Sequence, residues 1–344
     1  MKLTPIADFS NLGVYIDNLD FENLSVDEWV DLKNRLYSKY LLIIFRNTNL
    51  SLTGYTSKIG QWGKPSFAFK HFLRKYDISA GEIPSIMNDI HKVAASNISI
   101  DDYDTMCMLV RKRDILSDQN AVVIKLIGNS DAEADPHKSV TLNGELAWHQ
   151  DESMDIAFSE AIALFGNRSM TNSATGFLTT APWYENQTET FRSELNDMIA
   201  IHTYQPAMFN KNLDPVEKRV IECSTGFDNT LPLVINSAGG FKGLHYSPST
   251  ITGIVGMSDT ESKSLFEYIN KTLFVEEYIH DHWYQQDNDL LIFDNSITMH
   301  RRLGTTLNRI AYRSPFYFHD PVAERYTQRE YQEQFQTISQ ESLI

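Results

Sequence analysis

Cysteine, basic residues and long apolar runs are all scarce in this chain of 344 residues. The two cysteines, Cys107 and Cys223, are too few for a disulfide framework and lack a zinc-binding spacing. They favour an intracellular protein, which we expect in the cytoplasm. The N-terminal residues lack the apolar core of a signal peptide, and no apolar run reaches the roughly 18 residues of a membrane span. We therefore expect no membrane partner.

Negative charge dominates the composition. The 45 aspartates and glutamates outnumber the 30 lysines and arginines, which gives a formal net charge of -15. Phosphate backbones and anionic membranes bind positively charged surfaces, so this charge weighs against a nucleic-acid partner. Hydrophobic residues make up 42% of the chain, enough for a sizeable core in an ordinary globular protein. The sequence leaves a homo-oligomer open.

Helix and strand signals are clear at several places along the chain. Capping boxes at Ser25 and Ser258, together with apolar residues at helical spacing, indicate helices. The expected helices are at residues 25–36, 52–62, 188–200 and 258–273. Apolar runs predict strands at 41–45, 290–293 and 310–318. Strands at the centre and helices at the flanks favour a mainly β barrel or sandwich with flanking helices.

Two segments fit this pattern less well. Residues at about 91–140 are polar except for the apolar run 122–127, and they predict an excursion with an edge strand, or a lid. The C-terminal residues, at about 323–344, are charged and rich in glutamine, which indicates a surface helix. No internal repeat or low-complexity segment is present, so we expect a single domain over residues 1–344.

The strongest chemical signal is Trp148-His149-Gln150-Asp151. On a strand, residues two apart point to the same face, so the His149 imidazole and the Asp151 carboxylate would converge. A histidine from elsewhere would complete a two-His-one-carboxylate triad, which leaves coordination positions open as non-haem Fe(II) oxygenases require. Because His-x-Asp is common by chance, a hydrogen-bonded pair inside a barrel is the alternative interpretation.

A second signal follows the apolar strand at 290–293. The segment Asp294–His300 comes directly after it, and Arg309 and Arg313 follow in another apolar stretch. On one strand the two arginines would face the same side, about 13 Å apart. Unpaired arginines are costly to bury, and a guanidinium binds a carboxylate with two parallel hydrogen bonds. A dicarboxylate cosubstrate is therefore a natural partner for them.

The order and spacing of these blocks resemble the taurine dioxygenase and 2,4-dichlorophenoxyacetate dioxygenase superfamily. Its members are oxygenases that depend on Fe(II) and 2-oxoglutarate. The resemblance extends over most of the chain and rests on residues 42–47, 59–63, 144–151, 175–177, 243–248, 294–300, 309 and 313. It implies a double-stranded β-helix, or jelly-roll, core. It also implies O2 as a reactant, with succinate and CO2 released.

The resemblance implies a role for each matching residue. His149 and Asp151 match the paired metal ligands, and His300 matches the distal ligand. Arg309 and Thr175 match the residues that hold the far carboxylate of 2-oxoglutarate. Each also has a structural alternative, such as an ion pair for Arg309 or an ordinary strand position for Thr175.

The substrate side of the match is looser. Arg313 matches an arginine that reaches the substrate or the near carboxylate of 2-oxoglutarate, and Glu145 and His71 fall near substrate-contacting positions. Arg313 favours an anionic group and Glu145 a cationic one, so we expect a small polar, amino-acid-like substrate. Glu145 facing solvent and a non-catalytic His71 are the alternatives.

The implied reaction is hydroxylation, or another oxidation such as desaturation, of an unactivated carbon. Asp151 occupies the position that related halogenases leave for chloride, which argues against halogenation. Two other functions stay open. One is oxidation of a macromolecule, either a protein side chain or a nucleobase, and the other is a non-catalytic jelly roll that binds a ligand.

The run His280-Asp281-His282 is a rival candidate for a metal site. His280 and His282 would face the same way on a strand. No third ligand lies at a useful spacing, so we expect a structural role for both histidines.

Overall fold

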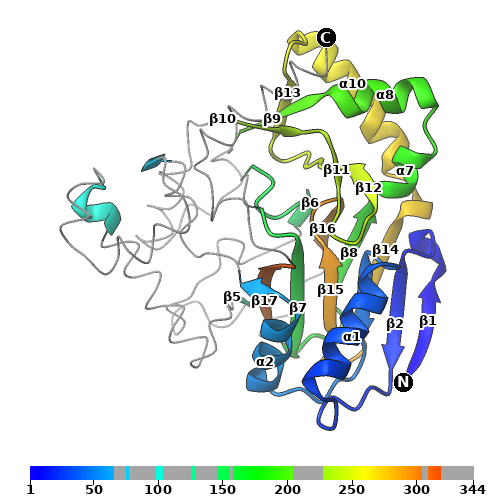
Figure 1. The fold of residues 1–344 in the computed structure, drawn as a ribbon, viewed down its shortest axis with the longest axis vertical. Coiled ribbons are helices and arrows are strands. Elements are labelled where there is room, and N and C mark those ends of the chain that lie inside the picture. The colour runs from blue at the N-terminus through cyan, green and yellow to red at the C-terminus, as the bar shows by residue number, and fades with distance from the viewer. Residues whose placement is uncertain are drawn as a thin grey trace.

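A computed structural model of the protein describes residues 1–65, 75–76, 98–103, 125–128, 146–154, 158–203, 228–303 and 309–318. Figure 1 shows two facing β-sheets with helices packed outside them. The expected lid at 91–140 lies outside the described residues apart from 98–103 and 125–128. The expected tail helix at 323–344 lies outside them altogether. Both assignments, and the single domain over residues 1–344, stay predictions.

The larger sheet contains eight strands in its described part, in the order β1-β2-β3-β15-β7-β17-β4, and β5 also pairs with β17. These strands are β1 (Lys2–Ile6), β2 (Gly13–Asp17), β3 (Leu42–Phe45), β4 (Lys64–Pro65), β5 (Lys125–Gly128), β7 (Ala161–Arg168), β15 (Leu290–Asp294) and β17 (Ile310–Tyr317). The predicted strands at 41–45, 290–293 and 310–318 are confirmed as β3, β15 and β17. The short strand β5 includes the end of the apolar run 122–127.

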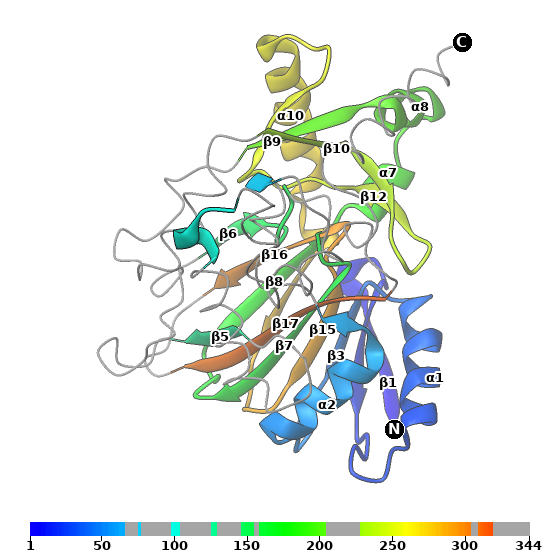
Figure 2. The same cartoon turned by 60° about the vertical axis from the view of Figure 1, so that its left-hand side comes forward.

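The smaller sheet carries most of the candidate site. Its strands are β14 (Ile279–Trp283), β8 (Ala174–Thr179), β16 (Thr298–Leu303) and β6 (Leu146–His149), in that order and all antiparallel. Figure 2 shows β6, β8 and β16 on one side of the strands β7 and β15. Together the two sheets form the expected double-stranded β-helix.

Two minor sheets extend the molecule beyond the smaller sheet. The first contains β10 (Asp228–Pro232), β9 (Ile199–Thr203) and β13 (Ile251–Ile254), and the second contains β11 (Val234–Asn236) and β12 (Lys242–Leu244). Short 3-10 helices lie at η1 (Ala7–Phe9) and η4 (Glu276–Tyr278).

Two N-terminal helices cover the outer face of the larger sheet (Figure 1). Helix α1 (Val26–Tyr37) begins at the predicted capping box of Ser25, and α2 (Leu52–Trp62) has the predicted bounds. The indole rings of Trp29 and Trp62 stack between the helices, with 4.4 Å between ring centroids. Burial of such large rings fixes the helices on the sheet.

Strand β3 shows why the larger sheet is apolar on both faces. Ile43 and Phe45 pack outward against the helices, whereas Leu42 and Ile44 pack inward between the two sheets. Alternate side chains of a strand point to opposite faces, so a continuous apolar run supplies two separate cores. The inner core forms the apolar surroundings of the candidate site.

Helices α7 (Ala181–Glu185), α8 (Glu189–Asp197) and α10 (Asp259–Leu273) pack against the outer face of the smaller sheet. Helix α10 begins at the predicted capping box of Ser258. The predicted helix at 188–200 is too long, because α8 ends at Asp197 and strand β9 begins at residue 199. Pairing of β9 with β10 and β13 overrides the helical spacing there.

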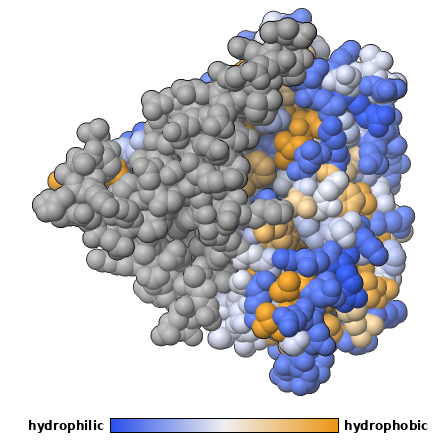
Figure 3. Space-filling view, in the orientation of Figure 1, coloured by the Kyte–Doolittle hydropathy of each residue, from blue (hydrophilic) through white to orange (hydrophobic). Residues whose placement is uncertain are grey.

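None of the described helices is long and apolar enough to cross a membrane. On the face drawn in Figure 3, hydrophobic residues are interspersed among hydrophilic ones over the described surface. The large exposed hydrophobic residues with described burial are Met1, Leu3, Val26, Ile100, Val255, Tyr268 and Trp283.

Candidate active site

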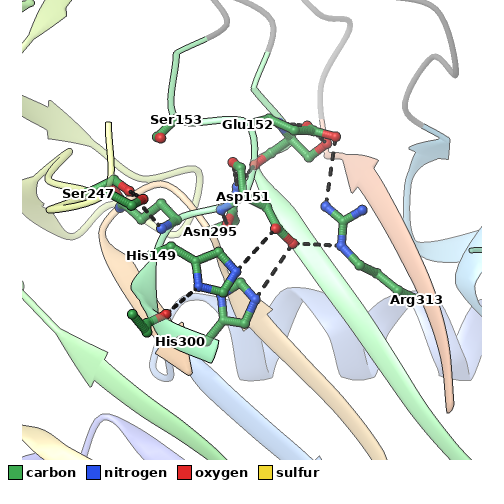
Figure 4. A network of polar contacts seen from close by, with 12 residues as sticks. His149, Asp151, Glu152, Ser153, Ser247, Asn295, His300 and Arg313 are labelled. Carbon is green, nitrogen blue, oxygen red and sulfur yellow. Dashed lines mark hydrogen bonds and ion pairs between the residues drawn. The ribbon is translucent and has the colours of Figure 1, made fainter. Parts of the chain in front are cut away.

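Three predicted site residues converge between the two sheets. Strand β6 ends at His149, and β16 places His300 directly opposite it, with 4.1 Å between the ring centroids. The Asp151 carboxylate lies 3.6 Å from Nε2 of His149 and 3.7 Å from Nε2 of His300. Figure 4 shows the carboxylate pointing toward both rings. One donor atom from each residue lies within 4.8 Å of the others, so the three could hold one metal ion.

Both imidazoles are in a state suited to metal binding. Nδ1 of His149 lies 2.8 Å from the carbonyl oxygen of Ala147, so it carries the proton and leaves the lone pair of Nε2 for a ligand. Burial, with a smaller effect of nearby His149, lowers the pKa of His300 to about 3. The ring of His300 is therefore neutral at physiological pH, and neutral imidazole is the form that binds metals.

The Asp151 carboxylate is charged in spite of its burial. Burial alone would raise its pKa, but Arg313, His300 and His149 together lower it well below the usual value. Arg313 has the largest of these effects because its positive charge lies next to the carboxylate, with a hydrogen bond of 2.6 Å from its Nε to Oδ2 of Asp151. The site therefore offers one carboxylate and two imidazole donors, a combination that binds a divalent cation.

Asn295 fixes the backbone of the loop that carries Asp151. Its side-chain oxygen accepts a hydrogen bond of 3.0 Å from the Asp151 amide. Its Nδ2 donates to the carbonyl oxygens of Asp151 and Ser159, each at 2.9 Å. The side chain of Asn295 is fully buried, so these bonds are shielded from water. Sequence analysis placed Asn295 in a matching block but missed this contact.

A second group of buried donors surrounds Arg309. This side chain is only 8% exposed, and its Nε and Nη1 have no hydrogen-bond partner among the described residues. Burial lowers the pKa of Arg309 below its usual value. Thr175, on β8, is buried nearby, and its hydroxyl lies 3.3 Å from that of Tyr284. An unpaired buried guanidinium is costly, so this pocket is suited to an anion.

Comparison with known proteins identifies the family. The profile described as "Taurine catabolism dioxygenase TauD, TfdA family" matches residues 103–314, more than half of the chain. The chain belongs to the TauD/TfdA family. It is therefore a 2-oxoglutarate-dependent non-haem iron dioxygenase. A search of curated proteins returned no significant match.

Solved structures show the same TauD/TfdA fold. AAD-2, in complex with Mn(II) and N-oxalylglycine, has a TM-score of 0.63 and 16% identity, over 93% of this chain and 99% of that chain. A taurine dioxygenase from Burkholderia xenovorans has a TM-score of 0.60 and 16% identity, over 93% of this chain and 92% of that chain. At this identity the likeness concerns the fold.

The described residues fit the Fe(II) and 2-oxoglutarate that TauD/TfdA proteins use. Two histidines and one carboxylate on one side of a metal are the usual donors for Fe(II) in oxygenases. The unpartnered Nε and Nη1 of Arg309 are suited to one carboxylate of 2-oxoglutarate.

Other predicted residues have mixed outcomes. Arg313 lies beside the triad, where its Nη2 is 3.8 Å from the Glu152 carboxylate (Figure 4). Glu145 and His71 lie outside the described residues. Sequence analysis assigned no role to Arg302, which pairs across β16 and β8 with Thr175. Burial and the nearby Arg309 lower the pKa of Arg302 to about 10.

The rival histidines are held by partners of their own. Nδ1 of His280 lies 2.9 Å from the carboxylate of Asp8, and its Nε2 lies 2.9 Å from the hydroxyl of Tyr15. Nε2 of His282 lies 3.1 Å from the carboxylate of Asp289. Within the described ranges, the triad at 149, 151 and 300 is the one group of three or more suited to a metal ion.

Proposed function

We propose that His149, Asp151 and His300 bind Fe(II), and that Arg309 and Thr175 bind the distal carboxylate of 2-oxoglutarate. The observation that carries this proposal is the position of the three donors, within 4.8 Å of one another in the interior of the fold. The unpartnered Nε and Nη1 of Arg309 support the assignment of the cosubstrate site, because these buried donors need an acceptor.

The bound iron and 2-oxoglutarate would supply oxidation of an unactivated carbon by O2, with release of succinate and CO2. The role of the chain is to hold these groups and to keep the site dry. Phe293 packs against the ring of His300, with 4.9 Å between the ring centroids, and covers the side of the imidazole that faces the apolar core. Three protein ligands on one side of the metal leave the other side for cosubstrate and O2.

We further propose that the substrate is a small polar, amino-acid-like molecule and that the reaction is hydroxylation. Arg313 and Glu152 support this because they place opposite charges next to the triad. A guanidinium is suited to a carboxylate, and a carboxylate is suited to an ammonium group. Arg313 already binds Asp151, and Glu152 accepts hydrogen bonds from Ser159. The two groups therefore form a charged surface beside the triad that favours a polar molecule over a purely apolar one.

Anaerobic binding tests the metal and cosubstrate together. The protein with Fe(II) and 2-oxoglutarate should show a weak visible charge-transfer band. Asp151→Ala and His300→Ala should each remove the band, whereas His280→Gln, a change at a histidine held by Asp8 and Tyr15, should keep it. A folded wild-type protein without the band would overturn the proposal.

A substrate screen tests the reaction. Pools of amino acids, amines and small acids would be incubated with the loaded protein, and succinate release would be compared with the background without substrate. We expect an amino-acid-like compound to raise succinate release and to gain one oxygen atom by mass spectrometry. Product formation only with peptides or oligonucleotides would contradict the small-molecule assignment.

A further inference from the structure

We propose that Tyr284 is a third residue that binds the distal carboxylate of 2-oxoglutarate, together with Arg309 and Thr175. This inference rests on the proposed cosubstrate site and adds to it a hydroxyl donor that no sequence motif indicates.

Tyr284 lies next to Thr175 because of a backbone contact. It directly follows β14, and its amide donates a hydrogen bond of 3.1 Å to the carbonyl oxygen of Ser173, just before β8. This contact extends the alignment of β14 with β8 by one residue. The Tyr284 side chain is only 2% exposed, and its hydroxyl lies 3.3 Å from the hydroxyl of Thr175.

The pocket has more hydrogen-bond donors than acceptors. The hydroxyls of Thr175 and Tyr284 share one hydrogen bond, so one of the two O–H groups is left to donate elsewhere. Nε and Nη1 of Arg309 are also without a partner among the described residues. The Arg309 guanidinium lies over the Tyr284 ring, 5.9 Å from its centre, so the three side chains are neighbours. A carboxylate accepts through both oxygens and can satisfy such a set.

The hydroxyl of Tyr284 is a donor at neutral pH. Burial raises its pKa above the usual value, and the opposing effect of Arg309 is smaller. The group therefore stays protonated and can donate to a carboxylate. The ring packs in the inner core with Leu164, Met170 and Ala311, where low polarity strengthens a hydrogen bond to an anion.

Two neighbours hold the Tyr284 ring in place. The His282 ring contacts it edge-on at 4.7 Å between centroids, and His282 is itself held by Asp289. On the other side lies Gly166, where an added Cβ would be 3.2 Å from the Tyr284 ring and 2.9 Å from Met170. Glycine at this position thus leaves room for the ring, and a fixed hydroxyl binds at a lower entropic cost than a mobile one.

The test compares two 2-oxo acids of equal chain length. 2-Oxovalerate has the keto and carboxylate groups that bind iron but lacks the distal carboxylate. We would measure dissociation constants of both acids for the Fe(II)-loaded protein without oxygen. Tyr284→Phe should raise the dissociation constant of 2-oxoglutarate by about tenfold or more, which is the usual effect of losing one hydrogen bond to a charged group. The same variant should bind 2-oxovalerate as the wild type does.

Tyr246→Phe is the matched control. Tyr246 is also buried, and its hydroxyl donates to Asn270 in the core outside the smaller sheet. This variant should leave the binding of both acids unchanged. If Tyr284→Phe binds 2-oxoglutarate as tightly as the wild type, the proposal is overturned. Equal weakening of both acids would also overturn it, because it would indicate a packing role.

Failure of the cosubstrate site itself has a different signature. Arg309→Met should weaken the binding of 2-oxoglutarate but not the binding of 2-oxovalerate. If Arg309→Met changes the binding of neither acid, Arg309 does not bind the distal carboxylate, and the proposed role of Tyr284 is wrong as well. If Tyr284→Phe does not fold, the wild type still provides a test. Addition of 2-oxoglutarate, but not of 2-oxovalerate, should change the tyrosine ultraviolet spectrum, and equal spectra would contradict the proposal.

Discussion

The smaller sheet carries two clusters of histidine and aspartate, and they differ in how their donor atoms are used. His149 and His300 lie opposite each other on β6 and β16, and His280 lies further along the same row on β14. Both ring nitrogens of His280 are engaged, one by the carboxylate of Asp8 and one by a hydroxyl. In the triad, the closest distances from Asp151 to the imidazoles are 3.6 Å and 3.7 Å, longer than a hydrogen bond.

This difference separates a structural cluster from a binding site. A cluster that serves the fold satisfies its own polar atoms, because an unmatched buried donor or acceptor destabilises the folded state. A cluster that binds a ligand leaves some donors or acceptors unpaired until the ligand binds, and the ligand-free protein is less stable for that reason. Nε and Nη1 of Arg309 are buried without partners among the described residues, whereas both ring nitrogens of His280 are engaged.

The largest contrast between the clusters should appear in metal affinity. His300→Ala removes a proposed ligand, and we expect the affinity for Mn(II) to fall by more than about a hundredfold, since even residues that only orient ligands change it by up to about that factor. His280→Gln should change it less than about twofold, because His280 is bound to Asp8 and Tyr15. Titrations followed by electron paramagnetic resonance would measure both. A similar loss in the two variants would remove the distinction between the clusters.

Two arginines, Arg309 and Arg301, should differ in the same way in their effect on 2-oxoglutarate binding. Arg309→Met removes a buried cation from the pocket, and we expect the KM for 2-oxoglutarate to rise by about a hundredfold, the effect of two charge-assisted hydrogen bonds. Arg301→Met is the control, because Arg301 is paired with Asp281 at 3.0 Å on the outside of the sheet. Steady-state assays of succinate release would measure the KM. An unchanged value for Arg309→Met would contradict the cosubstrate assignment.

Acid should destabilise the metal-free protein through His300. Its pKa is lowered from 6.5 to about 3, so the unfolded state binds the proton more readily and stability is lost as pH falls through this range. Between pH 6.5 and about pH 4.5 the loss from this group should be roughly 2 kcal/mol. Urea unfolding at several pH values would show it. His300→Gln should flatten this part of the curve, and an unchanged slope would contradict the burial of a neutral ring.

The smallest expected effect concerns Asn295. Asn295→Ala leaves all three proposed ligands in place but frees the backbone of Asp151, so we expect metal affinity to fall by about tenfold. Asn270→Ala, at an asparagine that accepts a bond from Tyr246, is the matched control. Thermal melting would check that both variants fold. If both bind Mn(II) like the wild type, Asn295 serves the fold and not the metal.

Local patterns in the sequence were sufficient for much of this account. The spacing of His149 and Asp151 predicted a shared site, which the structure shows, but the expected strand geometry was wrong because β6 ends at His149 and Asp151 lies in the turn after it. The bounds of α2 follow from its apolar spacing and the glycine after it. By contrast, Asn295 is 144 residues from Asp151 in the chain, and their contact depends on how two sheets meet. The helix predicted to reach residue 200 failed for a related reason, because distant strands pair with Ile199–Thr203.

The contacts of Tyr284 and Arg302 could not be predicted from the sequence either. Tyr284 follows a strand and has no motif around it, and only the alignment of β14 with β8 brings its hydroxyl to Thr175. Arg302 is two residues after His300 on β16, and its nearness to Arg309 does not follow from any local spacing in the sequence. Such contacts join segments whose relative position no local spacing encodes.

The most direct test of the central claim is a crystal structure with Mn(II) and 2-oxoglutarate. We expect anomalous density for one ion bound by His149, Asp151 and His300. The distal carboxylate of 2-oxoglutarate should then contact Arg309. An ion bound instead at His280 and His282, or 2-oxoglutarate bound away from Arg309, would contradict the account.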